Sequence, residues 1–382
     1  MRSRVEEQLA EKNYSHAAMI YEAILQLDST TKRSITDKWL AIPNLEVRDL
    51  SNATGERVKA SVSKLAIESG DYQKALAWDP ENSEALGMKN AAELAEALAR
   101  GDYRTALKIS PDNATALSMQ RAAEVQQALD ERDYDAALRL NPTLARAAML
   151  NMSPVRNSIG IDLKLIPGGT FLINEGGENA HEVILSKSFY IGVFEVTQEQ
   201  YAKVMVDNPS YFKSPQHPVE RVSWDDAIAF CRKLSSLPAE QAARRFYHLP
   251  TEAQWEYACR AGTGTAFSFG DKETQVSQHA WYDGNSGNKT HPVGGKRANP
   301  WGLYDMHGNV WEWCRDWYGD YTVRSVKDPL GPSSGLSRVI RGGSWYDFAE
   351  SCRSVARDAF TPSNRNSSHG GFRIMCVILG QR

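Results

Sequence analysis

The sequence has few cysteines, and their spacing shows no pattern typical of a metal or redox site. The 382 residues include five cysteines, at positions 231, 259, 314, 352 and 376, and no CxxC pair. Five scattered thiols are too few for a disulfide scaffold and lack the spacing of a zinc site. We therefore expect buried free thiols, and one or two bridges between the early and the late cysteines only in an oxidising compartment.

The sequence also lacks a long apolar run and an excess of charge of one sign. No stretch approaches the roughly 18 apolar residues of a membrane span, and the start MRSRVEEQLAEKNYSH is too charged for a secretory signal. A net charge of -3 gives no electrostatic reason to expect nucleic acid as a partner. We therefore expect a cytoplasmic protein that binds neither membrane nor nucleic acid, and the length indicates two domains.

A repeat of 31 residues occupies part of the N-terminal half. The copies are GDYQKALAWDP at 70–80, GDYRTALKISP at 101–111 and RDYDAALRLNP at 132–142. Ala- and Leu-rich stretches with helical spacing lie between the copies, and Gly-Asp and Asp-Pro pairs mark the turns. Equivalent positions predict equivalent packing sites, for example at Ala75, Ala106 and Ala137.

This region, residues 1–150 with the 31-residue period at 70–148, resembles degenerate tetratricopeptide repeats with a shortened second helix. It predicts an all-α array of stacked helical hairpins, which makes a protein partner for the array one expectation. A helical spacer or an oligomerisation arm without a specific ligand is the alternative. The stretch IPNLEVRDLSNATGERV within the first 60 residues fits no repeat.

After about residue 150 the pattern changes to short strand-like runs, frequent glycine and proline, and most of the ten tryptophans. We place the domain boundary near 150–160 and the second domain at 158–382. Strands are expected within 163–173, 181–197 and 370–379. Helices are expected within 197–207, 224–237 and 251–262, each with a capping residue or a first-turn acid. Without a βαβ rhythm the fold class is α+β with many loops.

Short segments of this domain match one family in order and spacing. They run from IPGGTF at 166–171 through HPVERVSWDDAIAFC at 217–231 and DMHGNVWEW at 305–313 to RVIRGGSW at 338–345 and GGFRIM at 370–375. The domain resembles the formylglycine-generating-enzyme, or sulfatase-modifying-factor, superfamily. That resemblance implies a C-type-lectin-like fold that is poor in regular secondary structure.

Several residue types in these segments indicate structural roles. Tryptophans other than Trp345 are expected to pack in the core, because each supplies a large apolar area with one donor. Glycines are expected where φ is positive or where the backbone packs closely, and arginines where a forked donor bridges loop carbonyls and acids. The residues concerned are Trp224, Trp255, Trp301, Trp311 and Trp313; Gly302, Gly308, Gly342, Gly343 and Gly371; and Arg341, Arg357 and Arg373.

One motif predicts a calcium site. Asp305 and Glu312 flank the carbonyls of Gly308 and Val310 on an irregular turn, and these are the hard oxygen ligands that calcium prefers. The resemblance implies a structural calcium at this motif. A helix cap with a solvated acid is the alternative.

Copper and iron are not expected. The oxidases of the superfamily hold copper with two cysteines spaced CxxxxC after GGS, because thiolates suit Cu(I). Here GGSWYDFAESC places Asp347 at the first position and Cys352 at the second, in a segment shorter than that of the oxidases. The eight histidines contain no helical i, i+4 pair that would suggest an iron site. We therefore expect no catalytic residues, although a divergent metal-dependent oxidoreductase with an unrecognised site is the alternative.

The segment from GGSW to GFR is also similar to variable proteins of diversity-generating retroelements, in which it forms a ligand pocket. Adenine mutagenesis in such systems converts template asparagines, and the residues at the corresponding positions here are all reachable from an asparagine codon. Aromatic side chains among small polar ones are typical of binding surfaces. An ordinary family member with a drifted loop is the alternative. The positions are Tyr346, Asp347, Phe348, Ser351, Asp358, Ala359, Phe360, Thr361, Ser367, Ser368 and His369.

The sequence therefore predicts a non-catalytic protein that binds a protein or a small ligand at the surface formed by residues 345–370. The ligand, the partner of the helical arm and the oligomeric state do not follow from the sequence. The expected binding residues are Trp345, Tyr346, Asp347, Phe348, Ser351, Asp358, Phe360, Thr361, Ser367, Ser368 and His369.

Overall fold

A computed structural model describes residues 53–174, 179–321, 324–365 and 368–378. Its contacts divide the chain into two compact units, Met1–Arg121 and Ala122–Arg382, so the division falls inside one helix and N-terminal to the expected 150–160. The start of the chain and its irregular stretch up to residue 52 lie outside the described residues, as does Ser367. In the described part, no helix is long and apolar enough to cross a membrane.

The repeats form helical hairpins in which a long helix alternates with a helix of seven residues, as predicted. Ala75, Ala106 and Ala137 lie at the same position of successive short helices and are all fully buried. Each short helix begins after an aspartate whose side chain accepts a backbone N–H. The helices are α4 (Ala53–Glu68), α5 (Tyr72–Trp78), α6 (Ser83–Ala99), α7 (Tyr103–Ile109), α8 (Ala114–Asp130), α9 (Tyr134–Leu140) and α10 (Pro142–Asn151).

The last hairpin, α9 and α10, packs on the C-terminal domain and shares its core. Val125 and Met149 belong to the same buried cluster as Leu163. The hydroxyl of Tyr134 is 2.8 Å from that of Tyr190, and Lys164 Nζ donates to the carbonyl of Leu150 at 2.6 Å. These contacts explain why the second unit begins at Ala122, before the family-like sequence starts.

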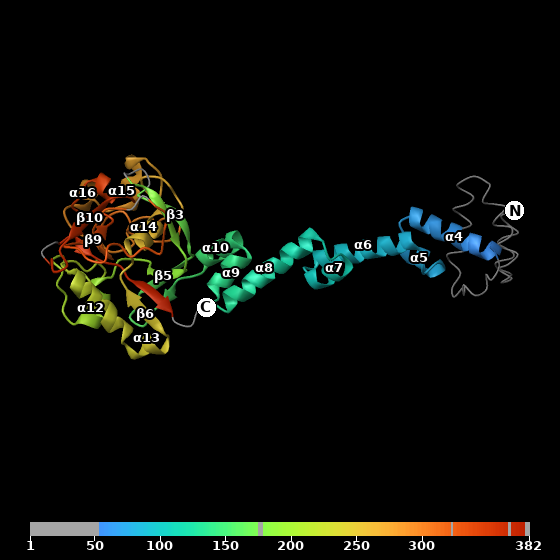
Figure 1. The fold of residues 1–382 in the computed structure, drawn as a ribbon, viewed down its shortest axis with the longest axis horizontal. Helices are drawn as coiled ribbons and strands as arrows, with labels where there is room; N and C mark the ends of the chain where they lie inside the picture. Colours follow the sequence, from blue (N-terminus) through green and yellow to red (C-terminus); the bar gives the residue numbers. More distant parts are fainter. Residues whose placement is uncertain (1–52, 175–178, 322–323, 366–367, 379–382) are drawn as a thin grey trace. The chain divides into compact units, whose positions relative to one another are not determined.

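The C-terminal unit contains three sheets. A five-stranded sheet has the order β1-β2-β5-β12-β6, a four-stranded sheet the order β10-β9-β7-β11, and a three-stranded sheet the order β3-β4-β8. In Figure 1, β6 lies beside the red C-terminal strand, in agreement with the pairing of Cys376 with Tyr247. The strands are β1 (Val155–Arg156), β2 (Asp162–Ile166), β3 (Gly169–Ile173), β4 (His181–Leu185), β5 (Phe189–Gly192), β6 (Arg245–His248), β7 (Trp311–Trp317), β8 (Val326–Lys327), β9 (Arg338–Arg341), β10 (Arg357–Phe360), β11 (Gly370–Gly371) and β12 (Met375–Ile378).

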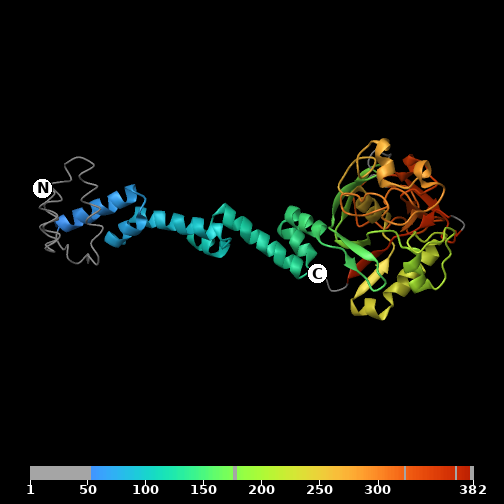
Figure 2. The ribbon, with the colours of Figure 1, turned by 180° about the vertical axis from the view of Figure 1, so that it is seen from behind.

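Short helices cover these sheets, and the three predicted ones are confirmed. Figure 2 shows α12 and α13 beside β6, which they contact. Thr197, Ser223 and Thr251 each form a capping box with the residue three positions later, which starts α11, α12 and α14. The helices are α11 (Gln198–Met205), α12 (Trp224–Ser235), α13 (Pro238–Ala242), α14 (Glu252–Arg260), η2 (Glu273–Gln275), α15 (Val276–His279), α16 (Asp283–Ser286) and η3 (Ala349–Cys352).

The predicted structural arginines are confirmed. Arg341 is fully buried and donates to the carbonyls of Val355 and Ala356 and to Glu256. Arg357 pairs with Glu252 through two nitrogens, each 2.9 Å or less from a carboxylate oxygen. Forked donors therefore tie loops together where regular strands are short.

Core tryptophans and close-packing glycines also follow the prediction. Trp255, Trp311 and Trp313 are buried, and Trp224 and Trp301 pack half-buried against the two main clusters. Four of the five glycines have positive φ. The fifth, Gly371, packs so closely that an added Cβ would lie 2.6 Å from the carbonyl oxygen of Val219. All five cysteines are buried and free, which confirms the expected thiols.

Candidate functional site: an aromatic surface

Trp345 forms the floor of the predicted binding region. The residue is only 7% exposed, so Trp345 is buried like the other tryptophans from which the sequence set it apart. The Trp345 backbone N–H donates to the carbonyl of Asn309, and its carbonyl accepts from the Ser286 hydroxyl at 2.7 Å. The indole Nε1 donates to the carbonyl of Ser368 at 3.0 Å. Trp345 thus joins the two ends of the segment that follows β9.

More exposed rings lie on this floor. Tyr346 is 60% exposed and stacks on His369 with ring centroids 5.8 Å apart. The ring centroid of Phe360 lies 6.4 Å from that of the same imidazole and 6.1 Å from that of Trp313. Burial lowers the pKa of His369, with Asp347 opposing this effect, so the ring is neutral at pH 7 and suited to stacking.

A second loop, which the sequence did not suggest, continues the row of rings. Phe212 packs edge-on to Trp345 at 5.3 Å, and Tyr211 packs edge-on to Phe212 at 5.0 Å. Tyr211 is 63% exposed, with the Arg221 guanidinium 5.2 Å from its ring centre. We call the whole set the aromatic surface. It consists of Tyr211, Phe212, Trp345, Tyr346, Phe360 and His369.

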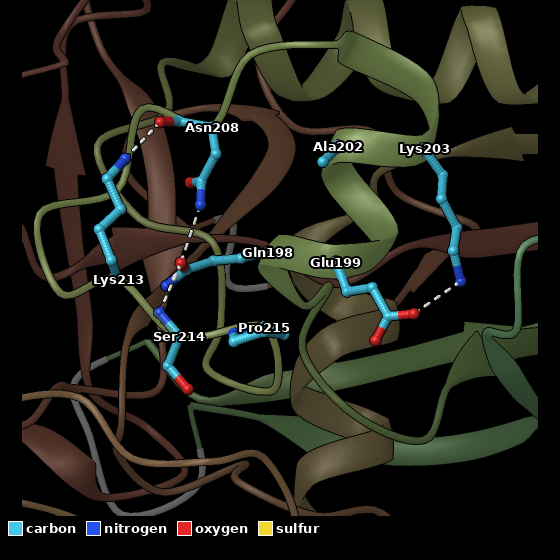
Figure 3. Close-up of a pocket in the computed structure, with 8 residues that line it drawn as sticks. All are labelled: Gln198, Glu199, Ala202, Lys203, Asn208, Lys213, Ser214 and Pro215. Atoms are coloured by element: carbon cyan, nitrogen blue, oxygen red, sulfur yellow. Dashed lines mark hydrogen bonds and ion pairs between the residues drawn. The ribbon is translucent and has the colours of Figure 1, made fainter.

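Gln198 holds the second loop in place. Figure 3 shows its side chain between Asn208 and Ser214, and its Nε2 donates to the carbonyl of Phe212 at 2.7 Å. Its Oε1 accepts from the Asn208 amide and from the Ser214 N–H. A cavity of about 540 Å³ lies beside these residues, but its charged side chains already have partners. Lys203 pairs with Glu199, and Lys213 donates to the carbonyl of Asn208.

Glu220 also holds the loop that carries Tyr211 and Phe212. Its carboxylate is fully buried, and Oε1 accepts from the Phe212 N–H at 2.8 Å. Oε2 is buried without a hydrogen-bond partner. Burial raises the pKa of Glu220 to about 7, against the lowering effect of the backbone N–H groups of Phe212 and Tyr211.

The other predicted binding residues surround or support the surface. Asp347 is half-buried, and its Oδ2 accepts from the Trp311 indole at 2.9 Å and from the Ser344 hydroxyl, so it positions the loop. Phe348 is 71% exposed, and its carbonyl accepts from the Ser351 N–H. Asp358 lies on β10 two residues from Phe360 and so faces the same side, and Thr361 follows, exposed.

The predicted calcium motif is only partly suited to a cation. Both oxygens of Glu312 accept from Arg373, and Oε2 also accepts from the Trp255 indole, so Arg373 is the ion partner of Glu312 in this structure. Asp305 fits better, because its buried Oδ1 has no partner. Gly308 and Val310 occupy the turn before β7, where the Val310 N–H donates to Glu195.

The electrostatics of this motif leave negative charge uncompensated. Asp305, Glu312 and Glu195 are buried around Arg373, and burial raises the pKa of Asp305 to about 6. Burial followed by the charge of Asp305 raises the pKa of Glu195 as well. Among the described residues, no group of three or more His, Cys, Asp or Glu side chains is arranged to hold a metal. Calcium binding here therefore stays a prediction that depends on Asp305.

The family described as "sulfatase-modifying factor enzyme 1-like domain" matches residues 154–378, which is more than half of the chain. The chain belongs to this family. The match covers all three sheets and every residue of the aromatic surface.

The proteins to which this chain is similar include a variable protein, a chaperone and an enzyme. Treponema denticola variable protein 1 aligns with a TM-score of 0.54 and 35% identity over 59% of this chain and 98% of that one. The chaperone protein LppX of Paenibacillus barcinonensis is 33% identical over 49% of this chain and 80% of its own length. The formylglycine-generating enzyme of Streptomyces coelicolor is 39% identical over 42% of this chain. The aligned part spans about half, 52%, of the length of that enzyme.

Cys352, the cysteine at the position of the expected copper motif, is buried. Cys352 is fully buried in a cluster with Phe267 and Val276. Burial raises the pKa of its thiol, as does the nearby charge of Asp347. Its sulfur packs against Gly343, where an added Cβ would lie 2.7 Å away. Burial of this kind disfavours the thiolate, which is the form of cysteine that reacts and binds metals.

Proposed function

We propose that the C-terminal domain is a non-catalytic binding module that uses the aromatic surface, with Phe348, to hold a protein ligand. One observation carries the proposal. Exposed rings from two separate loops are fixed side by side on a buried tryptophan, as in the contacts of Tyr211, Phe212, Trp345 and Tyr346.

The composition and exposure of this surface suit binding. Tyr211, Tyr346 and Phe348 are each more than half exposed, although exposed aromatic side chains are unfavourable unless a partner covers them. Rings with few rotatable bonds supply contact area at low entropic cost, and small polar neighbours such as Thr361 and Ser368 supply adaptable hydrogen bonds. This mixture is typical of a recognition surface for proteins.

The contacts that hold this surface favour a binding role over the alternative, a loop whose sequence has drifted without a function. Trp345 is held through its backbone N–H, its carbonyl and its indole nitrogen. Gln198 and Glu220 hold the second loop from the buried side. A pre-organised surface avoids much of the entropy cost of ordering side chains on association.

Similarity to the Treponema variable protein supports a second, finer part of the proposal, that this surface has been diversified by a retroelement. The positions proposed to vary include the exposed rings of Tyr346 and Phe348, whereas Trp345, which carries the fold contacts, is not among them. Variation at outward side chains such as these would change the ligand without disturbing the scaffold. Asp347 is the exception among the positions, because it accepts from Trp311 and Ser344.

The helical unit is proposed to contact a protein partner of its own. Leu86 and Leu117 stand at equivalent positions of successive repeats, 31 residues apart, and are 37% and 36% exposed. Partly exposed leucines that recur at the repeat period form a row along a stacked helical array, as protein-binding repeat surfaces do.

A photo-crosslinking experiment on the full chain tests the main proposal. A photoreactive phenylalanine analogue replaces Tyr346 in one protein and Phe246 in the control, because Phe246 is a 45% exposed aromatic residue on β6, in a different sheet. Each protein is illuminated in an extract of its own host cells, and adducts are identified by mass spectrometry. We expect a defined adduct from position 346 that position 246 does not give.

The identified partner is then purified and titrated against the wild type and the Tyr346→Ala and Phe246→Ala variants. Loss of a central aromatic contact costs about 2 kcal/mol or more, which corresponds to roughly thirtyfold weaker binding. Equal affinity of the three proteins would contradict the proposal.

A further inference from the structure

A second cavity lies in the C-terminal domain and shares no residue with the aromatic surface. Its volume is about 720 Å³. Side chains from α12, β6, β7 and β9 and the loop before β9 form its walls. The residues are Trp224, Ile228, Cys231, Arg232, Tyr247, His248, Arg315, Trp317, Leu330, Gly331, Pro332, Ser333 and Arg338.

The charge on these walls is of one sign. Arg232, Arg315 and Arg338 line the cavity, and no aspartate or glutamate does. None of the three forms a salt bridge with another described residue. Arg341 and Arg373, in contrast, are paired with buried carboxylates.

Arg338 is fixed rigidly in this wall. Its guanidinium carbon lies 3.9 Å from the ring centre of Trp224 and 3.4 Å from that of Trp317, so both faces are covered by indoles. Its Nη1 donates to the carbonyl of Arg315 at 2.7 Å. The Trp224 indole in turn donates to the carbonyl of Cys314 at 2.9 Å, which fixes that ring.

Donor capacity remains on Arg338 after these contacts. Its Nε is buried and has no hydrogen-bond partner. Burial lowers the pKa of Arg338, while Asp225 and Asp316 favour its charge from outside the cavity lining and Arg315 opposes it. An arginine with both faces stacked, a free Nε donor and no salt bridge is arranged to receive an anion.

We propose that this cavity binds the phosphoryl group of an organic phosphate. Three guanidinium groups match a dianion, and their planar donors match phosphate oxygens in pairs. Ile228, Leu330 and Pro332 line the same cavity and provide apolar contact for the organic part of the ligand. His248 adds a neutral ring, since burial lowers its pKa and the nearby Arg315 contributes to the same effect.

Calorimetric titration of the full chain with phenyl phosphate tests the proposal, with inorganic phosphate, benzoate and benzyl alcohol as comparison probes. We expect phenyl phosphate to bind more tightly than inorganic phosphate, because only it uses the apolar wall. We expect it also to bind more tightly than benzoate, which carries a single charge, and benzyl alcohol not to bind. Affinity falls as salt is raised, as for a charged site.

Variants separate a specific site from general positive charge. Arg232 and Arg315 are exposed, so Arg232→Gln and Arg315→Gln leave the fold intact. Each is expected to weaken phenyl phosphate binding by about tenfold. Lys233→Gln is the matched control, because Lys233 is the exposed neighbour of Arg232 on α12 and does not line the cavity. Its affinity should stay within about twofold of the wild type.

Arg338→Lys tests the role of the planar guanidinium that is stacked between the two indoles, since lysine keeps the charge without the planar donors. We expect a loss of affinity larger than that of Lys233→Gln while the melting temperature shows the variant folded. Three outcomes would overturn the proposal: no binding of phenyl phosphate up to about 10 mM, equal binding by the arginine variants and the control, or tighter binding of benzoate than of phenyl phosphate.

Discussion

The ring of Tyr346 lies nearly parallel to the imidazole of His369, with 9° between the planes, although the two residues come from opposite ends of the segment after β9. Trp345 lies edge-on to both, at 5.4 and 6.3 Å. The stack therefore closes the segment into one surface. That surface, and not the cysteine of the family's copper motif, is the exposed and chemically distinctive part of this region.

Replacing Gln198 should loosen the loop that carries Tyr211 and Phe212. Gln198→Leu removes the donor to the carbonyls of Phe212 and Pro218 and the acceptor for Ser214. The Pro218 carbonyl would then be buried, and the other two groups part-buried, without their partner. We therefore expect a loss of about 2–4 kcal/mol in the free energy of unfolding, measured by urea denaturation.

Gln216→Ala is the control for this change, because Gln216 is exposed and its side chain bonds to Glu199 at the surface, while its backbone bond with Val293 is kept in the variant. It should change the free energy of unfolding by less than about 0.5 kcal/mol. A Gln198→Leu protein as stable as the control would show that the loop does not depend on this side chain.

Glu220 gives a prediction for pH dependence. Its pKa in the folded protein is about 7, above the ordinary value of 4.5, so the fold favours the protonated form. The stability from this group is complete below about pH 4.5 and is lost as pH rises through 7. The full loss amounts to about 3 kcal/mol. Denaturation curves collected between pH 5 and 8 measure it.

The Glu220→Gln variant isolates this contribution from other titrating groups. Glutamine keeps an acceptor for the Phe212 N–H and cannot ionise, so the variant should lose less stability than the wild type between pH 5 and 8. Parallel curves for the two proteins would mean that Glu220 does not titrate in this range.

Calcium binding at Asp305 is tested by thermal unfolding with and without a chelator. Calcium at about one hundred times its dissociation constant stabilises by about 2.7 kcal/mol, which raises the melting temperature by several degrees. Asp305→Asn should abolish the rise, because Asp305 supplies the buried carboxylate oxygen without a partner. Asp283→Asn, at an exposed position, should keep it. An unchanged melting temperature in the wild type excludes this site.

The diversification proposal predicts a particular DNA sequence. A near-copy of the codons for residues 340–376 should lie close to the gene, beside a reverse transcriptase, and should differ from it only at adenines. The differences should fall on codons such as those of Tyr346 and Phe348 and spare that of Trp345. Sequencing of the flanking DNA decides this, and differences at other bases would contradict it.

Much of the fold was predictable because its signals are local. The 31-residue period places Ala75, Ala106 and Ala137 in the core, and capping residues such as Thr251 mark helix starts. Glycines and arginines of the family motifs also behave as expected, as Arg341 shows. Each depends on backbone geometry or on donor shape within a few residues of a recognisable motif.

The site was predicted only in part, because its other half is distant in sequence. Tyr211 and Phe212 join the surface through contacts with Trp345 that no local pattern reveals. The tertiary fold likewise buries Trp345. Glu312 resembled a calcium ligand in its motif, but Arg373, far along the chain, occupies its oxygens. Pairing between distant residues decides such roles.

The most direct measurement of the central claim is the affinity of the crosslinked partner for the full chain and for four single alanine variants. Tyr211, Tyr346 and Phe348 are exposed members or neighbours of the aromatic surface, and Phe246 is the control on another sheet. We expect Tyr211→Ala, Tyr346→Ala and Phe348→Ala to weaken binding by about tenfold or more at unchanged melting temperature, and Phe246→Ala to have no effect. Wild-type affinity in all four variants would contradict the claim that this surface binds the ligand.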